Sequence, residues 1–422
     1  MRVFGFLAIA LLAPVAAQAS ETSDLLASHL YAGTLAEGQA AFAAGKDAAD
    51  PEACFGWGLL SLAGAVEGLA QDFYRHGATV PGTDLAARLL GGDGAGATAP
   101  ANPAPEKLSY AGLRSIFSDF RSDVAAAQAG FLCGGVAGSD YVMAVDVLQA
   151  RLDLNGDGQT GDGETLGAFL APLLGELDGA APDEKSLSKG VGMADATVGF
   201  DAADAIWFAG YSQIVLAHVD LVLAHDFEGF FDAYLHRVFP QAGLPMQDYA
   251  QGGTLMLDPD SDAGIADIIA AIHTLNFPVI DRPLLASIPE ALGQVTALSR
   301  RNWDLILAET DDRAELIPNP GQTPLFGAPP VTDETVTAWR ETLDVLDQII
   351  AGDLLIPHWR FSQGFDLRAF FETAERTDLV LLLTGQAALP YLRDGPIADA
   401  QSFAAGNAVF GENFFNFALW FN

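Results

Sequence analysis

A twelve-residue stretch from Asp153 to Glu164 (DLNGDGQTGDGE) combines residue types and a spacing that can bind a hard metal ion. Oxygen donors stand at its positions 1, 3, 5, 7 and 12, which are Asp153, Asn155, Asp157, Gln159 and Glu164. Gly158 occupies position 6, where a calcium loop of this length makes a sharp turn. Gln159 would offer its backbone carbonyl, and a water would fill the vertex at Gly161. Because carboxylate and amide oxygens suit Ca²⁺, the sequence predicts one calcium site here.

Apolar residues at helical spacing flank this stretch on both sides. They are Val142, Val145, Leu148 and Leu152 before it, and Leu166, Phe169, Leu170, Leu173 and Leu174 after it. The unit over residues 140–176 therefore resembles an EF-hand, a calcium-binding helix–loop–helix, and the resemblance implies that the donors named above are its ligands. Position 8, which pairs with a second loop in paired EF-hands, is Thr160, so we expect a single loop.

A second acidic run, from Asp258 to Asp262, has the first three donor positions of such a loop but lacks the others. Ala263 stands where the turn needs glycine, and Ile269 stands where the closing glutamate would be. The run can also cap a helix, since Asp side chains accept hydrogen bonds from the first N–H groups of a helix. The sequence leaves a helix cap and a weak cation site as alternatives.

Four titratable residues, His218, His225, Asp232 and His236, share one face of a helix predicted over residues 202–239. Asp232 and His236 are one turn apart and could share a metal ion. Histidines on a helix face can equally be buried and hydrogen-bonded within the core. The structural interpretation is the more common one for histidines on a helix face, so we favour it over a shared metal ion.

Two short clusters concentrate arginine beside tryptophan, at residues 300–303 (RRNW) and at residues 358–360 (HWR). Each could bind a carboxylate or a sugar, or could pair with the many acidic residues of the chain. The sequence contains no nucleophile, metalloprotease, phosphate-loop or dinucleotide motif. These observations favour a non-enzymatic binding or scaffold protein. The alternative is a periplasmic hydrolase or another metal-dependent enzyme that uses His358, Arg360 and the helix histidines.

The first 19 residues have the pattern of a secretory signal peptide. An apolar core over residues 3–13 is followed by Ala17-Gln18-Ala19, so cleavage is expected between Ala19 and Ser20. The core is too short to span a bilayer, and we expect no later run to reach the roughly 18 apolar residues that a membrane helix needs. We therefore expect a periplasmic or secreted protein without a membrane span.

The formal net charge of the chain is −35. So acidic a chain is a poor partner for nucleic acid or for an anionic membrane, and it favours cations such as Ca²⁺ or a basic protein partner. The chain has two cysteines, Cys54 and Cys133. An oxidising compartment would allow a disulfide between them, but they could also be separate buried thiols.

Most of the chain that carries these candidate residues has the apolar spacing of α-helices. We expect an all-α chain, a predominantly helical, irregular multi-helix array with one EF-hand-like unit. Residues 20–90 form an N-terminal helical hairpin region, whose Phe42, Asp50-Pro51 and Phe55-x-x-Gly58 are similar to a tetratricopeptide-type hairpin, without a second copy. Residues 91–106 are rich in Gly, Ala and Pro and predict a linker or long loop. Residues 107–422 form the helical body, with the aromatic C-terminus packed into the core.

Overall fold

The computed structural model describes residues 20–79, 102–168, 197–246, 259–310, 312, 315–323, 331–411 and 414–421. The predicted signal peptide and most of the predicted linker lie outside the described residues. Within them the chain is predominantly helical, as the sequence predicts. The strands are short, and the described ones pair only in antiparallel twos.

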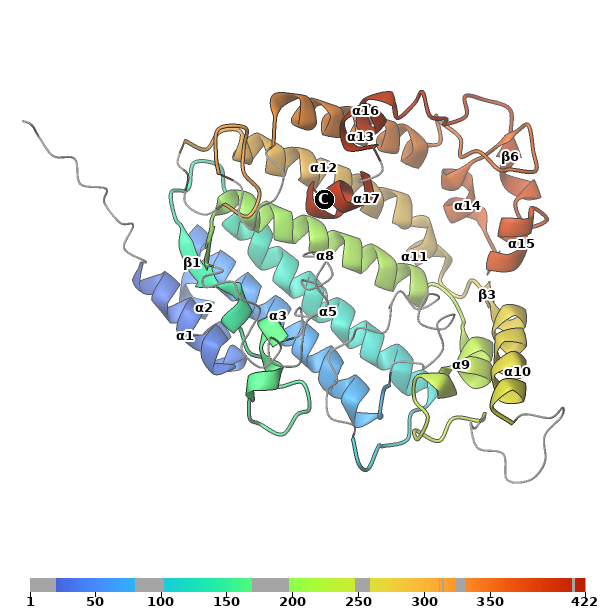
Figure 1. The fold of residues 1–422 in the computed structure, drawn as a ribbon, viewed down its shortest axis with the longest axis horizontal. Helices are drawn as coiled ribbons and strands as arrows, with labels where there is room; N and C mark the ends of the chain where they lie inside the picture. The colour runs from blue at the N-terminus through green and yellow to red at the C-terminus, as the bar shows by residue number, and fades with distance from the viewer. Residues whose placement is uncertain are drawn as a thin grey trace, which may run out of the picture.

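A row of five helices forms the centre of the molecule, each packed against the next (Figure 1). In spatial order these helices are α3 (Pro51–Arg75), α5 (Tyr110–Gly134), α8 (Ala202–Leu223), α12 (Ile288–Ile306) and α13 (Asp333–Ala351). Helix α8 is apolar around most of its circumference because α5 covers one side of it and α12 covers another. Its small residues Ala205 and Ala209 are fully buried in these contacts.

Within residues 20–79 the structure has one more helix than the predicted hairpin. Helices α1 (Glu21–Ala32) and α2 (Leu35–Asp47) are separate, because Gly33 ends α1 in the left-handed conformation with φ +66°. Helices α2 and α3 form the expected hairpin. Asp50 caps α3 and Pro51 begins it, at a position where proline loses no hydrogen bond.

The disulfide left open by the sequence is present and joins Cys54 of α3 to Cys133 of α5. Glycines bring the two helices close together at this crossing, where a Cβ added to Gly130 would lie 2.8 Å from the Cα of Gly58. The rings of Phe55 and Phe131 are fully buried beside the disulfide, with centroids 6.0 Å apart. The N-terminal hairpin is thus covalently joined to the body of the protein.

The prediction of one long helix over residues 202–239 is wrong, because α8 ends at Leu223. The chain then turns into the short helix α9 (Glu228–Tyr234) and the 3₁₀ turn η3 (Leu235–Arg237). His218, His225 and His236 therefore do not share one helix face. The break allows α9 to pack against α10 (Pro259–Thr274).

Helix α10 begins at Pro259, so Asp260 and Asp262 lie inside a helix and not in an ion-binding loop. This contradicts the alternative of a calcium-type loop at Asp258 to Asp262, because such a loop cannot form where the backbone is helical. Asp258 itself precedes the helix and lies outside the described residues, so the cap stays a prediction.

The C-terminal part adds short elements, some of which lie along α12 and α13 and others beyond one end of the helix row (Figure 1). They are α11 (Arg282–Ala286), α14 (Leu367–Thr373), α15 (Leu379–Thr384), η5 (Leu389–Tyr391), α16 (Ala404–Phe410) and α17 (Phe414–Phe421). Strand β3 (Asn276–Pro278) pairs with β5 (Arg376–Asp378), and β4 (Gly364–Phe365) pairs with β6 (Leu392–Arg393). Phe421 is fully buried, with its ring edge-on to Trp303 at 4.9 Å, which confirms that the C-terminal aromatics pack into the core.

Helices α3 and α8 are long and apolar enough to cross a membrane by length and composition alone. In the structure 44% and 50% of their qualifying stretches are buried inside the protein. Helix α8 also buries Asp220, which pairs with Arg121 of α5. Each of the two helices packs against helices on two sides, α3 against α2 and α5, and α8 against α5 and α12, which accounts for the apolar character of both.

Candidate functional site

The segment before the predicted calcium loop is a strand, where a helix was expected. Strand β1 (Met143–Asp146) pairs with β2 (Thr197–Phe200), and the 3₁₀ turn η1 (Val147–Gln149) follows it. Met143 and Val145 are buried while the residues between and after them are half-buried, which is the alternation of a strand. The prediction of a helix leading into the EF-hand-like loop is therefore wrong. The outgoing segment is helical from Leu166 to the limit of the described residues at 168.

The loop itself is closed at its base by backbone hydrogen bonds. Leu152 N–H donates to the carbonyl of Glu164 at 3.0 Å, and Leu166 N–H donates to the carbonyl of Ala150 at 2.8 Å. Gly156 and Gly158 have φ of +72° and +78°, which side chains other than glycine rarely adopt. The glycine that the sequence places at position 6 thus makes the sharp turn expected of it.

The side-chain oxygens at positions 1, 3 and 5 organise the turn. Asp153 accepts hydrogen bonds from Gly156 N–H at 2.7 Å and from Gly158 N–H at 2.9 Å. Asn155 accepts from Asp157 N–H, and Asp157 accepts from Gln159 N–H, both at 2.8 Å. These hydrogen bonds hold three of the predicted ligands in one compact turn.

Glu164 links the two halves of the loop from position 12, within the 3₁₀ turn η2 (Asp162–Glu164). Its Oε1 accepts from Leu154 N–H at 3.1 Å and its Oε2 accepts from Gly161 N–H at 2.7 Å. The carboxylate is therefore folded back over the start of the loop, as a closing ligand must be. The Gln159 side chain is exposed, and the role predicted for its backbone carbonyl stays a prediction.

Helix α3 contributes two residues to the loop that the sequence did not reveal. The N–H of Asp153 donates to Glu67 Oε2 at 2.6 Å, and Gln71 Nε2 donates to the carbonyl of Asp153 at 2.7 Å. Burial raises the pKa of Glu67, the hydrogen bond from Asp153 opposes this, and the carboxylates of Asp153 and Glu164 raise the pKa further. Glu67 is far from the loop in sequence, so no spacing pattern could have found it.

Thr160, the departure from the paired EF-hand pattern, packs against the end of α1. A Cβ added to Gly33 would lie only 2.5 Å from the Thr160 γ-methyl group, so the Thr160 side chain packs directly against the backbone of Gly33. Next to this contact, Arg151 N–H donates to the carbonyl of Leu30 at 2.9 Å. The position that would contact a second loop in a paired EF-hand here contacts helix α1.

A second set of carboxylates lies at the start of α8, where oxygens of Asp201, Glu309 and Glu315 are within 4.8 Å of one another. Asp201 caps α8 by accepting from Ala203 N–H at 2.7 Å. Burial raises the pKa of the neighbouring Asp204, and the charge of Asp201 raises it further. An oxygen-only set of this kind suits a hard cation. Asp201 is distant in sequence from Glu309 and Glu315, so no motif indicated the set.

The histidines and arginines singled out in the sequence are mostly held by structural hydrogen bonds and ion pairs. His225 Nε2 lies 2.7 Å from Thr377 Oγ1, and His358 Nε2 lies 3.1 Å from the carbonyl oxygen of Leu382. Arg300 pairs with two aspartates of α13, Asp344 at 2.8 Å and Asp347 at 2.7 Å. The guanidinium of Arg360 lies over the Trp359 ring, 4.1 Å from its centroid.

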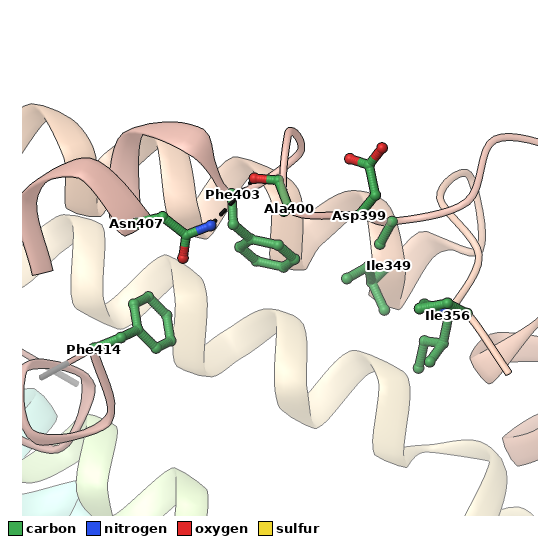
Figure 2. A pocket seen from close by; sticks show the side chains of 9 residues that line it. Ile349, Ile356, Asp399, Ala400, Phe403, Asn407 and Phe414 are labelled. Carbon is green, nitrogen blue, oxygen red and sulfur yellow. Dashed lines mark hydrogen bonds between the residues drawn. The ribbon is translucent and has the colours of Figure 1, made fainter. Parts of the chain in front are cut away.

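No two of these histidines line the same cavity among the three cavities that we describe, whose volumes are about 600, 560 and 360 Å³. Figure 2 shows the first of them, between α13, α16 and α17. Its wall is mainly apolar, Asn407 donates to the carbonyl of Ala400 at 3.2 Å, and the carboxylate of Asp399 points away from the apolar side chains. These residues offer no nucleophile with an adjacent base.

Comparisons of the chain with models of protein families, with curated proteins and with solved structures found no match.

Proposed function

We propose that this chain is an exported helical protein that binds one Ca²⁺ through the loop from Asp153 to Glu164. The ion has a structural role, and the protein acts as a binding or scaffold protein. The observation that carries the proposal is the arrangement of the loop. Its four side-chain donors, on Asp153, Asn155, Asp157 and Glu164, are held by one glycine-dependent turn that is closed at its base.

The charge of the loop supports a cation as the ligand. Within the part of the chain that the structure describes, no Lys or Arg pairs with Asp153, Asp157 or Glu164. Arg151 instead donates to the carbonyl of Gly161 at 3.0 Å and pairs with Asp162, whose side chain is fully exposed. Glu67 adds a further carboxylate from α3. Like charges this close raise each other's free energy, and a divalent cation would relieve that repulsion.

A structural role follows from what the loop contacts. Through Glu67 and Gln71 it is hydrogen-bonded to α3, and through Arg151 and Thr160 it contacts α1. An ion in the loop would therefore stabilise the packing of the N-terminal helices. Extracellular calcium modules bind with Kd on the order of 10⁻⁴–10⁻³ M, which suits permanent occupancy outside the cell and not signalling.

Export is supported by the disulfide between Cys54 and Cys133, because such bonds persist mainly in oxidising compartments. The signal-peptide pattern of residues 1–19 is a second, independent argument for export.

Calorimetric titration with Ca²⁺ and thermal melts with and without EDTA test the proposal. We expect one site, and a stabilisation of about 2.7 kcal/mol when free Ca²⁺ is 100-fold above Kd. Glu164→Gln should weaken binding at least about tenfold, because it removes the closing carboxylate. Asp162→Asn is the matched control, since it removes a charge from the same loop at a position that is not a ligand. Equal affinities in the two variants, or no heat and no shift in the wild type, would refute the site.

A further inference from the structure

An apolar cavity of about 560 Å³ lies where α3, α5, α8 and α9 meet the strand pair β3–β5, and the calcium loop plays no part in it. Six phenylalanines line it, namely Phe73, Phe117, Phe227, Phe230, Phe239 and Phe277. Apart from His225 and Thr377, the remaining lining residues are leucines and valines. A cavity of this size and composition is typical of sites that bind small molecules.

The polar side chains in its wall are already paired. His225 Nε2 shares a hydrogen bond with Thr377 Oγ1 at 2.7 Å, and His225 Nδ1 donates to the carbonyl of Leu221, also at 2.7 Å. A water molecule inside needs two to four polar partners, which this wall does not offer. Apolar contents would therefore be favoured over water.

Two of the lining side chains are also exposed to solvent, Val222 at 40% and Leu379 at 45%. They come from the end of α8 and the start of α15, so the cavity opens to the surface between these two helices. A small molecule thus has a path into the cavity.

We propose that this cavity binds an uncharged, lipid-like small molecule whose hydrocarbon body packs against the phenylalanines. Among the described residues that line the cavity there is no Lys or Arg that could neutralise an anionic head group, and the chain has a net charge of −35. Anionic amphiphiles such as fatty acids are therefore disfavoured relative to neutral molecules of the same length. The proposal does not depend on calcium binding.

Titration with N-phenyl-1-naphthylamine, an uncharged fluorescent probe, tests the proposal on the full mature chain. We expect a saturable rise in fluorescence with a single molecule bound per chain, and an increase in Tm on binding. Val222→Trp should fill the mouth of the cavity and weaken binding at least about tenfold. Val66→Trp is the matched control, because Val66 is 43% exposed on α3 and does not line the cavity.

A second pair of variants tests the same cavity mouth independently, in case a variant of the first pair does not fold. Leu379→Trp blocks the mouth from α15, and Leu383→Trp places the same residue on the same helix at a position that is 72% exposed. Displacement of the probe by 1-dodecanol and by dodecanoate tests the class of ligand, and the alcohol should displace it more strongly. The proposal is overturned if the probe does not saturate, if the mouth variants bind as well as their controls, or if dodecanoate is the better competitor.

Discussion

At the scale of single residues, His225 illustrates how a titratable side chain can serve packing. The sequence placed it among candidate metal ligands, whereas the structure buries its ring between Leu221 and Thr377, with both nitrogens engaged. Burial lowers the pKa of His225 below its ordinary value of 6.5, and the hydrogen bond to Leu221 opposes this shift. The folded protein therefore holds this imidazole in its neutral form.

This predicts a specific loss of stability in mild acid. Because the folded pKa lies below the unfolded one, the stability that His225 contributes is fully present above pH 6.5. It is lost as the pH falls from there through the lowered folded pKa. Urea denaturation between about pH 7 and pH 5 should show a smaller loss for His225→Gln than for the wild type. His218→Gln, an exposed change on the preceding helix α8, is the control and should keep the loss of stability that His225 causes. The same pH profile for both variants would contradict the prediction.

The residues that we propose as calcium ligands are of the opposite kind, since their types and spacing alone led to the proposal. The structure adds Glu67, whose carboxylate lies beside Asp153 and Glu164. A helix residue distant in sequence thus belongs to the same charged cluster as the contiguous motif. Only the packing of α3 against the loop could reveal it.

At the scale of elements, the crossing of α3 and α5 depends on glycine. A Cβ added to Gly130 would lie 2.8 Å from the Cα of Gly58 and 3.1 Å from the carbonyl oxygen of Cys54. Backbone atoms cannot move aside as a flexible side chain can, and the disulfide one turn away holds the helices together. The distance between these helices is therefore set by their small residues.

Gly130→Ala should accordingly destabilise the protein by about 2 kcal/mol, the cost typical of an overpacked core. Gly68→Ala is the control, because a Cβ there meets no atom within 4 Å. That change should be neutral or should stabilise by about 0.5–1 kcal/mol, since alanine favours a helix over glycine. Urea denaturation of both variants measures the difference, and a gain in stability for Gly130→Ala would show that the crossing tolerates a methyl group.

The incoming helix of the EF-hand-like unit is the clearest element that the sequence misassigned. Val142, Val145 and Leu148 have helical spacing, but Met143 and Val145 also alternate as a strand does. The strand forms because Thr197–Phe200 supplies a partner from a distant part of the chain. Local periodicity cannot reveal such a partner.

At the scale of the whole molecule, the disulfide joins two segments that are 79 residues apart. Closing so long a loop restricts the unfolded chain, which stabilises the folded state by roughly 4 kcal/mol. Replacing both Cys54 and Cys133 by alanine should lower the free energy of unfolding by about this amount. Urea denaturation of the double variant and of the oxidised wild type tests this. Equal unfolding midpoints, or thiols detected in the unreduced denatured protein, would contradict the prediction.

The sequence by itself determined the features that depend on contiguous residues. These are the helical class, the loop from Asp153 to Glu164 with its glycine turn, the hairpin at Asp50-Pro51 and the buried aromatic C-terminus. Each follows from local periodicity, a cap or a fixed spacing, which act over a few residues.

The tertiary structure decided everything that required distant segments to meet. It selected the disulfide from two open alternatives, replaced the incoming helix by a strand, and ended the long helix at Leu223. It also brought Glu67 to the loop, gathered Asp201, Glu309 and Glu315, and enclosed the phenylalanine cavity. These features arise from packing between elements far apart in the chain, and the free energy of such contacts is not encoded in any short stretch of residues.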